Sequence, residues 1–331
     1  MPSEVQRVSV VMPVLDEEAH LAASVRQVLQ QDWPGELEVV LAVGPCSDDT
    51  PRVAAEMAAA DPRVVLVDNP SGRTPDGLNR AIEAATGEVV ARVDAHAEIP
   101  PDYLRLAVAE LAETGADNVG GIMHAVGRTP FERAVACAMT SPLGVGSARF
   151  HVGGGAGPAD TVYLGVFRRE ALRRVGGYDP HFARAQDWEM NHRIRTSGGL
   201  VWFTPALRVT YRPRGSVRRL ARQYRDYGRW RRVVARQHPG TAGARYLAAP
   251  AMVVGTLAAT ALGTRWRPAL LVPLGYAVGV GLGGWSAGRG EPPAVRARVP
   301  LAMATMHWSW GIGFLTSPRA LAAAPRSSAA E

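Results

Sequence analysis

The first third of the chain alternates short apolar runs with segments of helical periodicity, and this alternation restricts the possible folds more than any other feature. Val8–Val14 is an apolar, β-branched run typical of a buried strand, and Glu17–Gln31 carries apolar residues at helical spacing. Three similar pairs follow: Leu37–Val43 with Thr50–Ala60, Val64–Val67 with Pro75–Ala85, and Val89–Val93 with Pro101–Leu111. Such alternation predicts an α/β fold with a mostly parallel sheet flanked by helices.

Polar residues follow each of the four predicted strands. They are Asp16-Glu17-Glu18, Ser47-Asp48-Asp49, Asn69 to Arg73, and Asp94-Ala95-His96. In open α/β sheets, the carboxyl ends of parallel strands and the adjacent helix N-termini form a crevice that binds nucleotides. We therefore expect these four groups to line one site.

The composition changes abruptly after Arg208. Ten arginines crowd the next segment: Arg212, Arg214, Arg218, Arg219, Arg222, Arg225, Arg229, Arg231, Arg232 and Arg236. Three apolar stretches without Asp, Glu or Arg follow, Tyr246–Thr264, Pro268–Trp285 and Val299–Thr316, each near the ~20 residues that cross hydrocarbon. We predict an amphipathic interfacial segment at 212–245, a membrane region of two to three helices at 246–317, and a flexible tail at 318–331. The alternative is a set of buried helices in a soluble domain.

The N-terminal residues lack the apolar core and cleavage site of a secretory signal, so we expect the first domain, 1–211, to face the cytoplasm. If the Arg-rich segment is cytoplasmic and all three apolar stretches cross, the C-terminus lies outside. Cys46 and Cys137 lack the spacing of a zinc or redox motif. The predicted location is the cytoplasmic membrane.

Asp94 and His96 are candidates for a metal site. Alternate side chains of an extended segment point the same way, so these two residues can address one ion. A divalent cation there would bridge diphosphate oxygens and neutralise charge on a departing nucleoside diphosphate. Asp-x-His alone is a weak motif, and the alternative is an ordinary polar turn before Pro100-Pro101.

Asp187 is the candidate general base. It follows Gly176-Gly177-Tyr178-Asp179 and precedes Arg193, in a turn that leads into a short helix. In an inverting sugar transfer, a base takes the proton from the acceptor hydroxyl while that oxygen attacks the anomeric carbon. The alternative is a helix N-cap or an ion pair with Arg193.

Taken together, these motifs make the chain resemble glycosyltransferase family 2, the inverting GT-A group, and in particular its succinoglycan-biosynthesis-type membrane-associated members. The resemblance covers about Val8 to Tyr211. It rests on segments that occur in the family's order: Val10 to Glu18, Ser47-Asp48-Asp49-Thr50, Asn69 to Asn79, Asp94-Ala95-His96, Gly165 to Glu170, and Gly176 to Glu189.

The resemblance implies roles for five residues. Pro13, Val14 and Glu17 would form part of the nucleoside pocket, and Arg73 would sit near the diphosphate. Asp94 would be the diphosphate and metal carboxylate. Each has a simpler alternative, because Pro13 can end a strand, Glu17 can favour a helix start, and Arg73 can be a solvated turn residue.

Two departures from the family pattern matter. Val43-Gly44 stands where relatives usually have an aspartate that hydrogen-bonds uracil, which leaves the nucleobase open. Asp48 or Asp49 could replace that contact, or could cap the helix beginning at Thr50. His96 replaces the usual last aspartate of Asp-x-Asp, and histidine is a sound Mn²⁺ ligand, so Mn²⁺ or Mg²⁺ is the expected cofactor.

Three aromatic or basic residues are candidates for the acceptor side. Trp188 follows the candidate base, and Arg229-Trp230 faintly resembles an acceptor-side element of processive family members, although the spacing differs. Arg229-Trp230 could stack on a sugar and hold a phosphate. The alternative is an interfacial helix on anionic lipid.

The leading functional prediction is transfer of a sugar from a nucleotide-sugar donor to a lipid-linked or polysaccharide acceptor, with polysaccharide-assembly proteins as further partners. One alternative is a polyprenyl-phosphate glycosyltransferase, and another is a non-catalytic membrane scaffold of polysaccharide assembly. A dinucleotide oxidoreductase is disfavoured because no Gly-x-Gly-x-x-Gly follows the first strand. No nucleic-acid partner is expected, since the arginines adjoin apolar stretches that suit lipid headgroups.

Overall fold

A computed structural model describes residues 6–322, which form two compact units. The first comprises the described residues up to His124 together with Gly153–Tyr211. The second comprises Ala125–Val152 together with the described residues from Arg212 onward. The sequence-based boundaries place 125–152 in the first domain, whereas its contacts group it with the C-terminal helices.

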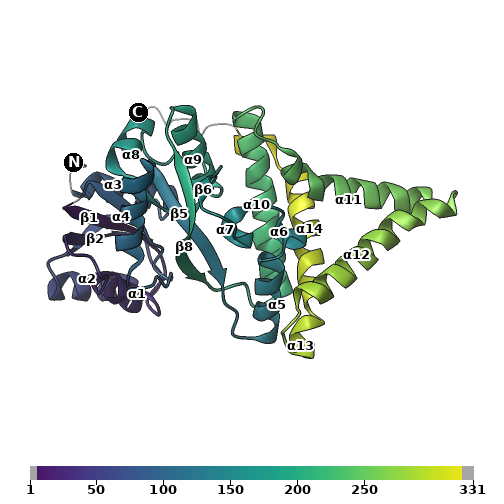
Figure 1. The fold of residues 1–331 in the computed structure, drawn as a ribbon, viewed down its shortest axis with the longest axis horizontal. Coiled ribbons are helices and arrows are strands. Elements are labelled where there is room, and N and C mark those ends of the chain that lie inside the picture. The colour runs from purple at the N-terminus through teal and green to yellow at the C-terminus, as the bar shows by residue number, and fades with distance from the viewer. Residues whose placement is uncertain (1–5, 323–331) are drawn as a thin grey trace. The chain divides into compact units, whose positions relative to one another are not determined.

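The first unit contains the sheet and six helices in its described residues (Figure 1). The strands are β1 (Arg7–Val14), β2 (Glu36–Val43), β3 (Val64–Asp68), β4 (Val89–Arg92), β5 (Asn118–Ala125, whose last residue belongs to the second unit), β6 (Gly157–Pro158), β7 (Tyr163–Arg168) and β8 (Val201–Tyr211). The helices are α1 (Leu21–Leu29), α2 (Thr50–Ala60), α3 (Thr74–Ala84), α4 (Tyr103–Thr114), α8 (Arg169–Val175) and α9 (Gln186–Thr196).

The strands form one sheet in the order β3-β2-β1-β4-β7-β5-β8-β6. The four strands predicted from the first part of the sequence pair in parallel, with Val10 opposite both Val39 and Ala91. The predicted α/β fold is confirmed. β7 pairs antiparallel with β4 and β5, and β6 pairs antiparallel with β8. All four parallel strands therefore direct their carboxyl ends to the same edge of the sheet, which carries the predicted polar loops.

The core of the first unit follows from its apolar strands. Six of the eight residues of β1 are buried, because neighbouring strands and helices cover both sides of a central strand. Helix α1 buries Leu21, Val25 and Val28. It begins four residues later than the start predicted at Glu17, since residues 17–20 form a polar turn. This turn leaves the side chains before α1 available to the site.

The second unit is helical in its described residues. Its elements are α5 (Pro130–Met139), α6 (Pro142–Val145), α7 (Arg149–Val152), α10 (Val217–Gln237), α11 (Ala244–Leu262), η1 (Arg267–Leu270), α12 (Leu271–Ala287), α13 (Pro293–Arg296), α14 (Val299–Leu315) and η2 (Arg319–Ala322). Two glycines allow α10 and α14 to approach closely. A Cβ on Gly228 would lie 2.1 Å from the carbonyl oxygen of Trp310, and one on Gly313 would lie 2.1 Å from that of Arg225. A larger residue at either glycine would push the two helices apart.

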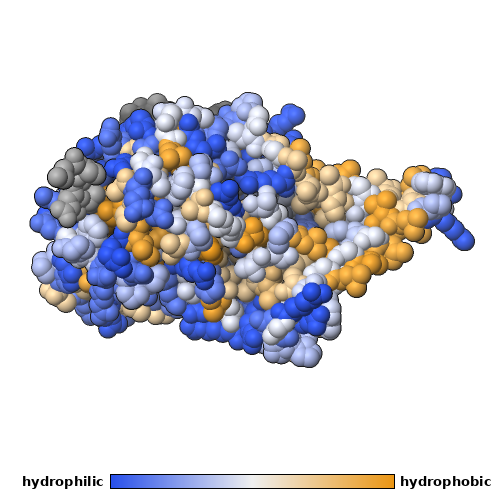
Figure 2. Space-filling view, in the orientation of Figure 1, coloured by the Kyte–Doolittle hydropathy of each residue, from blue (hydrophilic) through white to orange (hydrophobic). Residues whose placement is uncertain are grey.

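Two of the three predicted membrane stretches form helices long and apolar enough to cross a bilayer, within the described residues. These spans are Ala244–Leu262 and Arg267–Ala287. They meet at a short connection at one end of a hairpin (Figure 1), and Figure 2 shows hydrophobic residues along the hairpin with hydrophilic residues at its tip. The third stretch forms α14, which has 17 residues and packs along α10. The predicted tail lies outside the described residues from position 323 onward.

Candidate active site

The carboxyl ends of the first three strands meet, as the polar loops predict. The Gly44 amide donates to the carbonyl of Val14 (2.9 Å), and the Asn69 amide donates to the carbonyl of Val43 (2.9 Å). Pro13 and Val14 are the last two residues of β1. Two of the three residues predicted for the nucleoside pocket thus lie at the edge where the three loops converge.

Hydrogen bonds lock the loop after β1 to the loop after β2. The Glu17 amide donates to the Thr50 hydroxyl (2.7 Å), and the Glu18 amide donates to Asp48 Oδ2 (3.2 Å). Asp48 Oδ1 accepts from the Thr50 amide (3.0 Å), and its hydrogen bonds to Thr50 hold the pKa of Asp48 below its ordinary value. Asp48 therefore supports the turn before α2, whose N-cap residue is Asp49.

His96 pairs with Glu17 rather than extending a strand. The strand β4 ends at Arg92, and Ala95-His96 form a turn, so the predicted strand alternation does not apply to Asp94 and His96. His96 Nδ1 lies 2.7 Å from Glu17 Oε1. The turn folds back toward the loop after β1, and it places a predicted metal ligand against a predicted nucleotide residue.

Among the described residues, one group of side chains is compact enough to hold a metal ion, and it does not include Asp94 or His96. Asp16, Cys46 and Asp48 place one ligand atom each within 4.8 Å of one another. Asp16 Oδ1 already accepts from the Ser47 amide (2.6 Å), and both oxygens of Asp48 accept backbone N–H groups. These bonds hold the two loops together, so both aspartates have a structural role.

A buried arginine joins the two carboxylates that the sequence singles out. Arg92, the last residue of β4, is 4% exposed. Its Nε donates to Asp94 Oδ1 (3.0 Å), and its Nη1 donates to Asp187 Oδ1. Asp94 and Asp187 are 93 positions apart in the sequence, and the fold brings both to one guanidinium.

Burial and neighbouring charges shift the pKa values of Arg92 and Asp187. Burial disfavours the charged form of Arg92, but Asp187 and Asp94 outweigh that effect and raise the pKa of Arg92 well above its ordinary value. Burial raises the pKa of Asp187 although Arg92 acts in the opposite direction, and Asp94 adds to the increase. The Asp187 side chain is 29% exposed, so it keeps access to solvent while the protein around it removes much of its water.

The start of α9 places Asp187. Ala185 precedes the helix with φ 62°, a left-handed conformation that costs a non-glycine residue on the order of 1 kcal/mol. Gln186 and Asp187 then form the first turn of α9. Strained backbone of this kind persists where surrounding contacts enforce it, and it is found most often at functional sites.

Helix α3 holds the loop that precedes α9. Asn79 Nδ2 donates to the carbonyl of Tyr178 (2.7 Å), and the Tyr178 amide donates to Asn79 Oδ1 (2.7 Å). Arg73 Nη2 donates to the carbonyl of Pro180. Arg73 thus contacts this loop, and its role near a diphosphate stays a prediction.

The three candidates for the acceptor side fall in different units. Trp188 lies on α9 in the first unit and stacks on His192 with ring centroids 5.3 Å apart. Arg229 and Trp230 lie on α10 in the second unit, where Arg229 Nη1 is 3.8 Å from Asp226 Oδ1. Within the first unit, Trp188 is therefore the acceptor-side candidate adjacent to Asp187.

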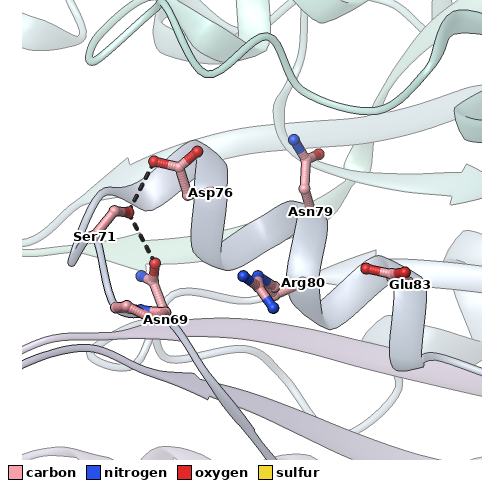
Figure 3. A pocket seen from close by; sticks show the side chains of 7 residues that line it. Asn69, Ser71, Asp76, Asn79, Arg80 and Glu83 are labelled. Carbon is pink, nitrogen blue, oxygen red and sulfur yellow. Dashed lines mark hydrogen bonds between the residues drawn. The ribbon is translucent and has the colours of Figure 1, made fainter. Parts of the chain in front are cut away.

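An open pocket of about 350 Å³ lies beside the loop after β3 and the first turns of α3. Its lining is Asn69, Pro70, Ser71, Asp76, Asn79, Arg80 and Glu83. Figure 3 shows Ser71 bridging Asn69 and Asp76, with Asn79 and Arg80 leaving α3 in different directions. Neither Asp94 nor Asp187 lines it, so this pocket is separate from the carboxylate pair.

Three residues of this arrangement were not given roles from the sequence: Arg92, Asn79 and Tyr178. Arg92 ends β4 two positions before Asp94, so its closeness to Asp94 in the sequence was a usable signal for it. Asn79 and Tyr178 are 99 positions apart. Nothing local indicates that they bond.

Comparison with known proteins relates this geometry to a family. The family model described as "Glycosyl transferase family 2" matches residues 9–176. The chain is 32% identical over 308 residues to the succinoglycan biosynthesis protein ExoA of Rhizobium meliloti (strain 1021), covering 92% of this chain and 93% of that protein. It is 23% identical over 230 residues to the dolichyl N-acetyl-alpha-D-glucosaminyl phosphate 3-beta-D-2,3-diacetamido-2,3-dideoxy-beta-D-glucuronosyltransferase of Methanococcus voltae, covering 67% of this chain and 71% of that protein.

Among solved structures, the chain is similar to the mannosyltransferase PcManGT from Pyrobaculum calidifontis, which was determined in complex with GDP-Man and Mn²⁺. The TM-score is 0.58 at 22% identity, covering 92% of this chain and 87% of that chain. At this identity the likeness shows the fold. The predicted GT-A architecture is thereby confirmed.

Proposed function

Because the chain belongs to glycosyl transferase family 2 and is a glycosyltransferase, we propose that it moves a sugar, with inversion, from a nucleotide-sugar donor to a lipid-linked or polysaccharide acceptor. The names of its relatives support this acceptor class, since one refers to succinoglycan biosynthesis and another to a dolichyl phosphate sugar. The observation that carries the proposal is the contact of Asp94 and Asp187 with one guanidinium.

In the proposed reaction, Asp187 takes the proton of the acceptor hydroxyl while that oxygen attacks the anomeric carbon. Its position in the first turn of α9, partly open to solvent, leaves room for an acceptor. Pro13 and Val14 would form one wall of the nucleoside pocket. Trp188 would offer an aromatic face to a sugar of the acceptor.

The proposed cofactor is a divalent cation, Mn²⁺ or Mg²⁺, held by Asp94 and His96. Asp94, His96 and Glu17 offer two carboxylates and an imidazole, a donor set that suits Mn²⁺. Such an ion, when bound, neutralises charge on the departing nucleoside diphosphate. The 2.7 Å contact between His96 and Glu17 orients both side chains before any ligand arrives.

The test is release of nucleoside diphosphate from a panel of nucleotide sugars by the purified full-length chain in detergent with Mn²⁺. Asp187→Asn should lower turnover about 10³-fold while leaving the unfolding midpoint and nucleoside diphosphate affinity near those of the wild type. Asp32→Asn is the control, since Asp32 is a surface carboxylate, 67% exposed, paired with Arg105. Full turnover by Asp187→Asn would refute the base role. Failure of the wild type to bind any nucleoside diphosphate would refute the donor class.

A lipid phosphate is a second candidate acceptor, because the arginines of α10 could bind a phosphate. A phosphate oxygen is already ionised at neutral pH, so it needs little base catalysis. Asp187→Asn would then retain most of the activity with polyprenyl phosphate. The same variant separates the two acceptor classes without knowledge of the sugar.

We further propose that α11 and α12 cross the membrane as a hairpin, with the catalytic unit on the cytoplasmic face. The connection between them contains Arg265, Trp266 and Arg267, residue types suited to a membrane–water interface. Two crossings return the chain to its starting side, so a reporter fused after Glu331 should be cytoplasmic. A reporter inserted after Thr264 should be external, and a cytoplasmic result there would contradict the hairpin.

A further inference from the structure

Arg92 differs from most arginines of the first unit in being buried while its two partners are not. Its side chain is 5% exposed, compared with 21% for Asp94 and 29% for Asp187. The guanidinium lies behind both carboxylates, and Cζ is 6.0 Å from the centroid of the Tyr178 ring. A reactant that reaches the carboxylates therefore meets them before it meets Arg92.

Two carboxylates in one partly dehydrated site repel each other, and the repulsion favours either proton uptake by one of them or their separation. A buried guanidinium between them offsets the repulsion. One cation against two carboxylates leaves one negative charge at the site, so attraction for a cationic ligand remains. The planar fork of arginine also fixes direction, because each N–H group points to one acceptor.

We propose that Arg92 is a positioning residue that sets the separation and orientation of Asp94 and Asp187, and so links the donor side of the reaction to the acceptor side. This inference rests on the proposed function. Its contacts come from three separate parts of the chain: the end of β4, the turn after it, and the first turn of α9. Tyr178, which packs beside the guanidinium, is in turn held by both hydrogen bonds of Asn79.

Arg52 provides a matched contrast. It also joins two carboxylates, Asp49 and Glu56, at 3.2 and 2.6 Å. Its side chain is 59% exposed, and the partners lie on the same helix or at its N-cap. Pairing with two carboxylates is thus common to both arginines, whereas burial and long-range contacts belong to Arg92.

The experiment compares Arg92→Lys, Arg92→Gln and Arg52→Lys in the full-length chain, each alone, and Arg92→Lys combined with Asp187→Asn. Lysine keeps the charge but lacks the fork, so kcat of Arg92→Lys should fall about 10²-fold, the effect of a misplacement near 1 Å, with KM for the donor within about threefold of wild type. The kcat of Arg92→Gln should fall further than that of Arg92→Lys, because glutamine also lacks the charge. Arg52→Lys should behave as wild type.

The background variant decides whether Arg92 acts through Asp187. In the Asp187→Asn background, the loss of kcat caused by Arg92→Lys should be much smaller than about 10²-fold, because one of the two carboxylates that Arg92 positions no longer acts as a base. An equal loss in both backgrounds would overturn the proposal, as would wild-type kcat in Arg92→Lys. Neither result would refute the proposed function, as long as the wild type releases nucleoside diphosphate and Asp187→Asn does not.

A second experiment measures unfolding midpoints. It requires neither an enzymatic assay nor a substitution of Arg92 itself. Asp94→Asn and Asp187→Asn each leave Arg92 one carboxylate, whereas the double variant leaves a buried charge without either carboxylate. The unfolding midpoint of the double variant should fall by clearly more than the sum of the two single shifts. Additive shifts would show that the two carboxylates are not coupled through Arg92, and the proposal would fail even in an active enzyme.

Discussion

The two units of the molecule use arginine in different ways. In the first unit, arginines pair with carboxylates: Arg92 with Asp94 and Asp187, and Arg193 with Glu189 at 2.7 Å. In the second unit, helix α10 carries eight arginines against one acidic residue. Two of these arginines lie over aromatic rings: the exposed Arg232, 4.9 Å from the centroid of Phe314, and the buried Arg231, 3.8 Å from the centroid of Tyr246.

The difference shows that arginine can position catalytic side chains in one unit and provide positive charge in the other. A carboxylate neutralises a guanidinium and fixes its direction, which suits a site where atoms must be placed to a fraction of an ångström. An aromatic face holds the guanidinium but leaves its charge, which suits attraction to anionic headgroups. Sequence composition alone reports only the sum, a net charge of +7.

The largest expected effect comes from removing one carboxylate of the first unit. Asp94→Asn should lower turnover about 10³-fold, because the neutral side chain weakens both cation binding and the contact with Arg92. Affinity for Mn²⁺, measured by calorimetry with nucleoside diphosphate present, should fall as well. The matched control is Glu291→Gln, which breaks the 2.5 Å ion pair with Arg133 in the second unit and should leave turnover within about twofold. Equal losses of turnover in Asp94→Asn and Glu291→Gln would show that the arginine pairs of the two units do not differ in importance.

The next effect concerns the hairpin, where apolar surface rather than arginine should determine insertion. Val254 and Val278 are about half-exposed and lie near the middle of the two candidate spans. Aspartate at the centre of a crossing helix costs about 3 kcal/mol, so Val254→Asp with Val278→Asp should release much of the protein from membranes at alkaline pH. Thr264→Asp, at the hairpin tip, should remain in the membrane fraction. The opposite result would be membrane binding that survives the paired aspartates but is lost when the α10 arginines are replaced by acidic residues. It would show that the arginines anchor the protein.

A third effect tests the hydrogen bonds that preorganise the first unit. Asn79→Ala removes both bonds to the Tyr178 backbone, and leaving such groups unsatisfied costs about 1–3 kcal/mol. The unfolding midpoint should fall, and kcat should fall with it because the loop before α9 loses its support. Arg80→Ala is the control, since Arg80 is exposed on the next position of α3. A stable Asn79→Ala enzyme with normal kcat would show that α9 is placed by other contacts.

Local pattern was enough to predict the parallel half of the sheet and the edge where its polar loops meet. Buried β-branched runs and helical spacing act within a few residues, so they can be recognised without knowledge of the fold. The antiparallel strands β5, β7 and β8 were not predicted, because their pairing joins segments whose separation in sequence carries no local signal. The predicted helix start at Glu17 was early since bonds to Thr50 and Asp48 hold residues 17 and 18 outside α1.

The candidate site divides in the same manner. Asp94 and Asp187 were chosen from motifs, and the structure places both on one side chain. Their chemical roles stay predictions. The geometry of His96 was misjudged, because a turn after β4 replaces the assumed extended segment and directs His96 to Glu17. A contact such as His96–Glu17 forms only because the sheet brings two loops together that are distant in the sequence.

The smallest expected effect comes from Arg52, and it sharpens the comparison by separating pairing from burial. Arg52→Gln removes contacts to Asp49 and Glu56, yet water replaces them readily at a side chain that is 59% exposed. Turnover and the unfolding midpoint should match the wild type at physiological salt. At low salt, near 0.01 M, where the Debye length reaches about 30 Å, a small decrease of the midpoint should emerge, because surface charges are then less screened. Thermal unfolding at both salt concentrations measures this. A large salt-independent loss would mean that two carboxylate partners suffice to make an arginine important, and burial would no longer explain what distinguishes Arg92.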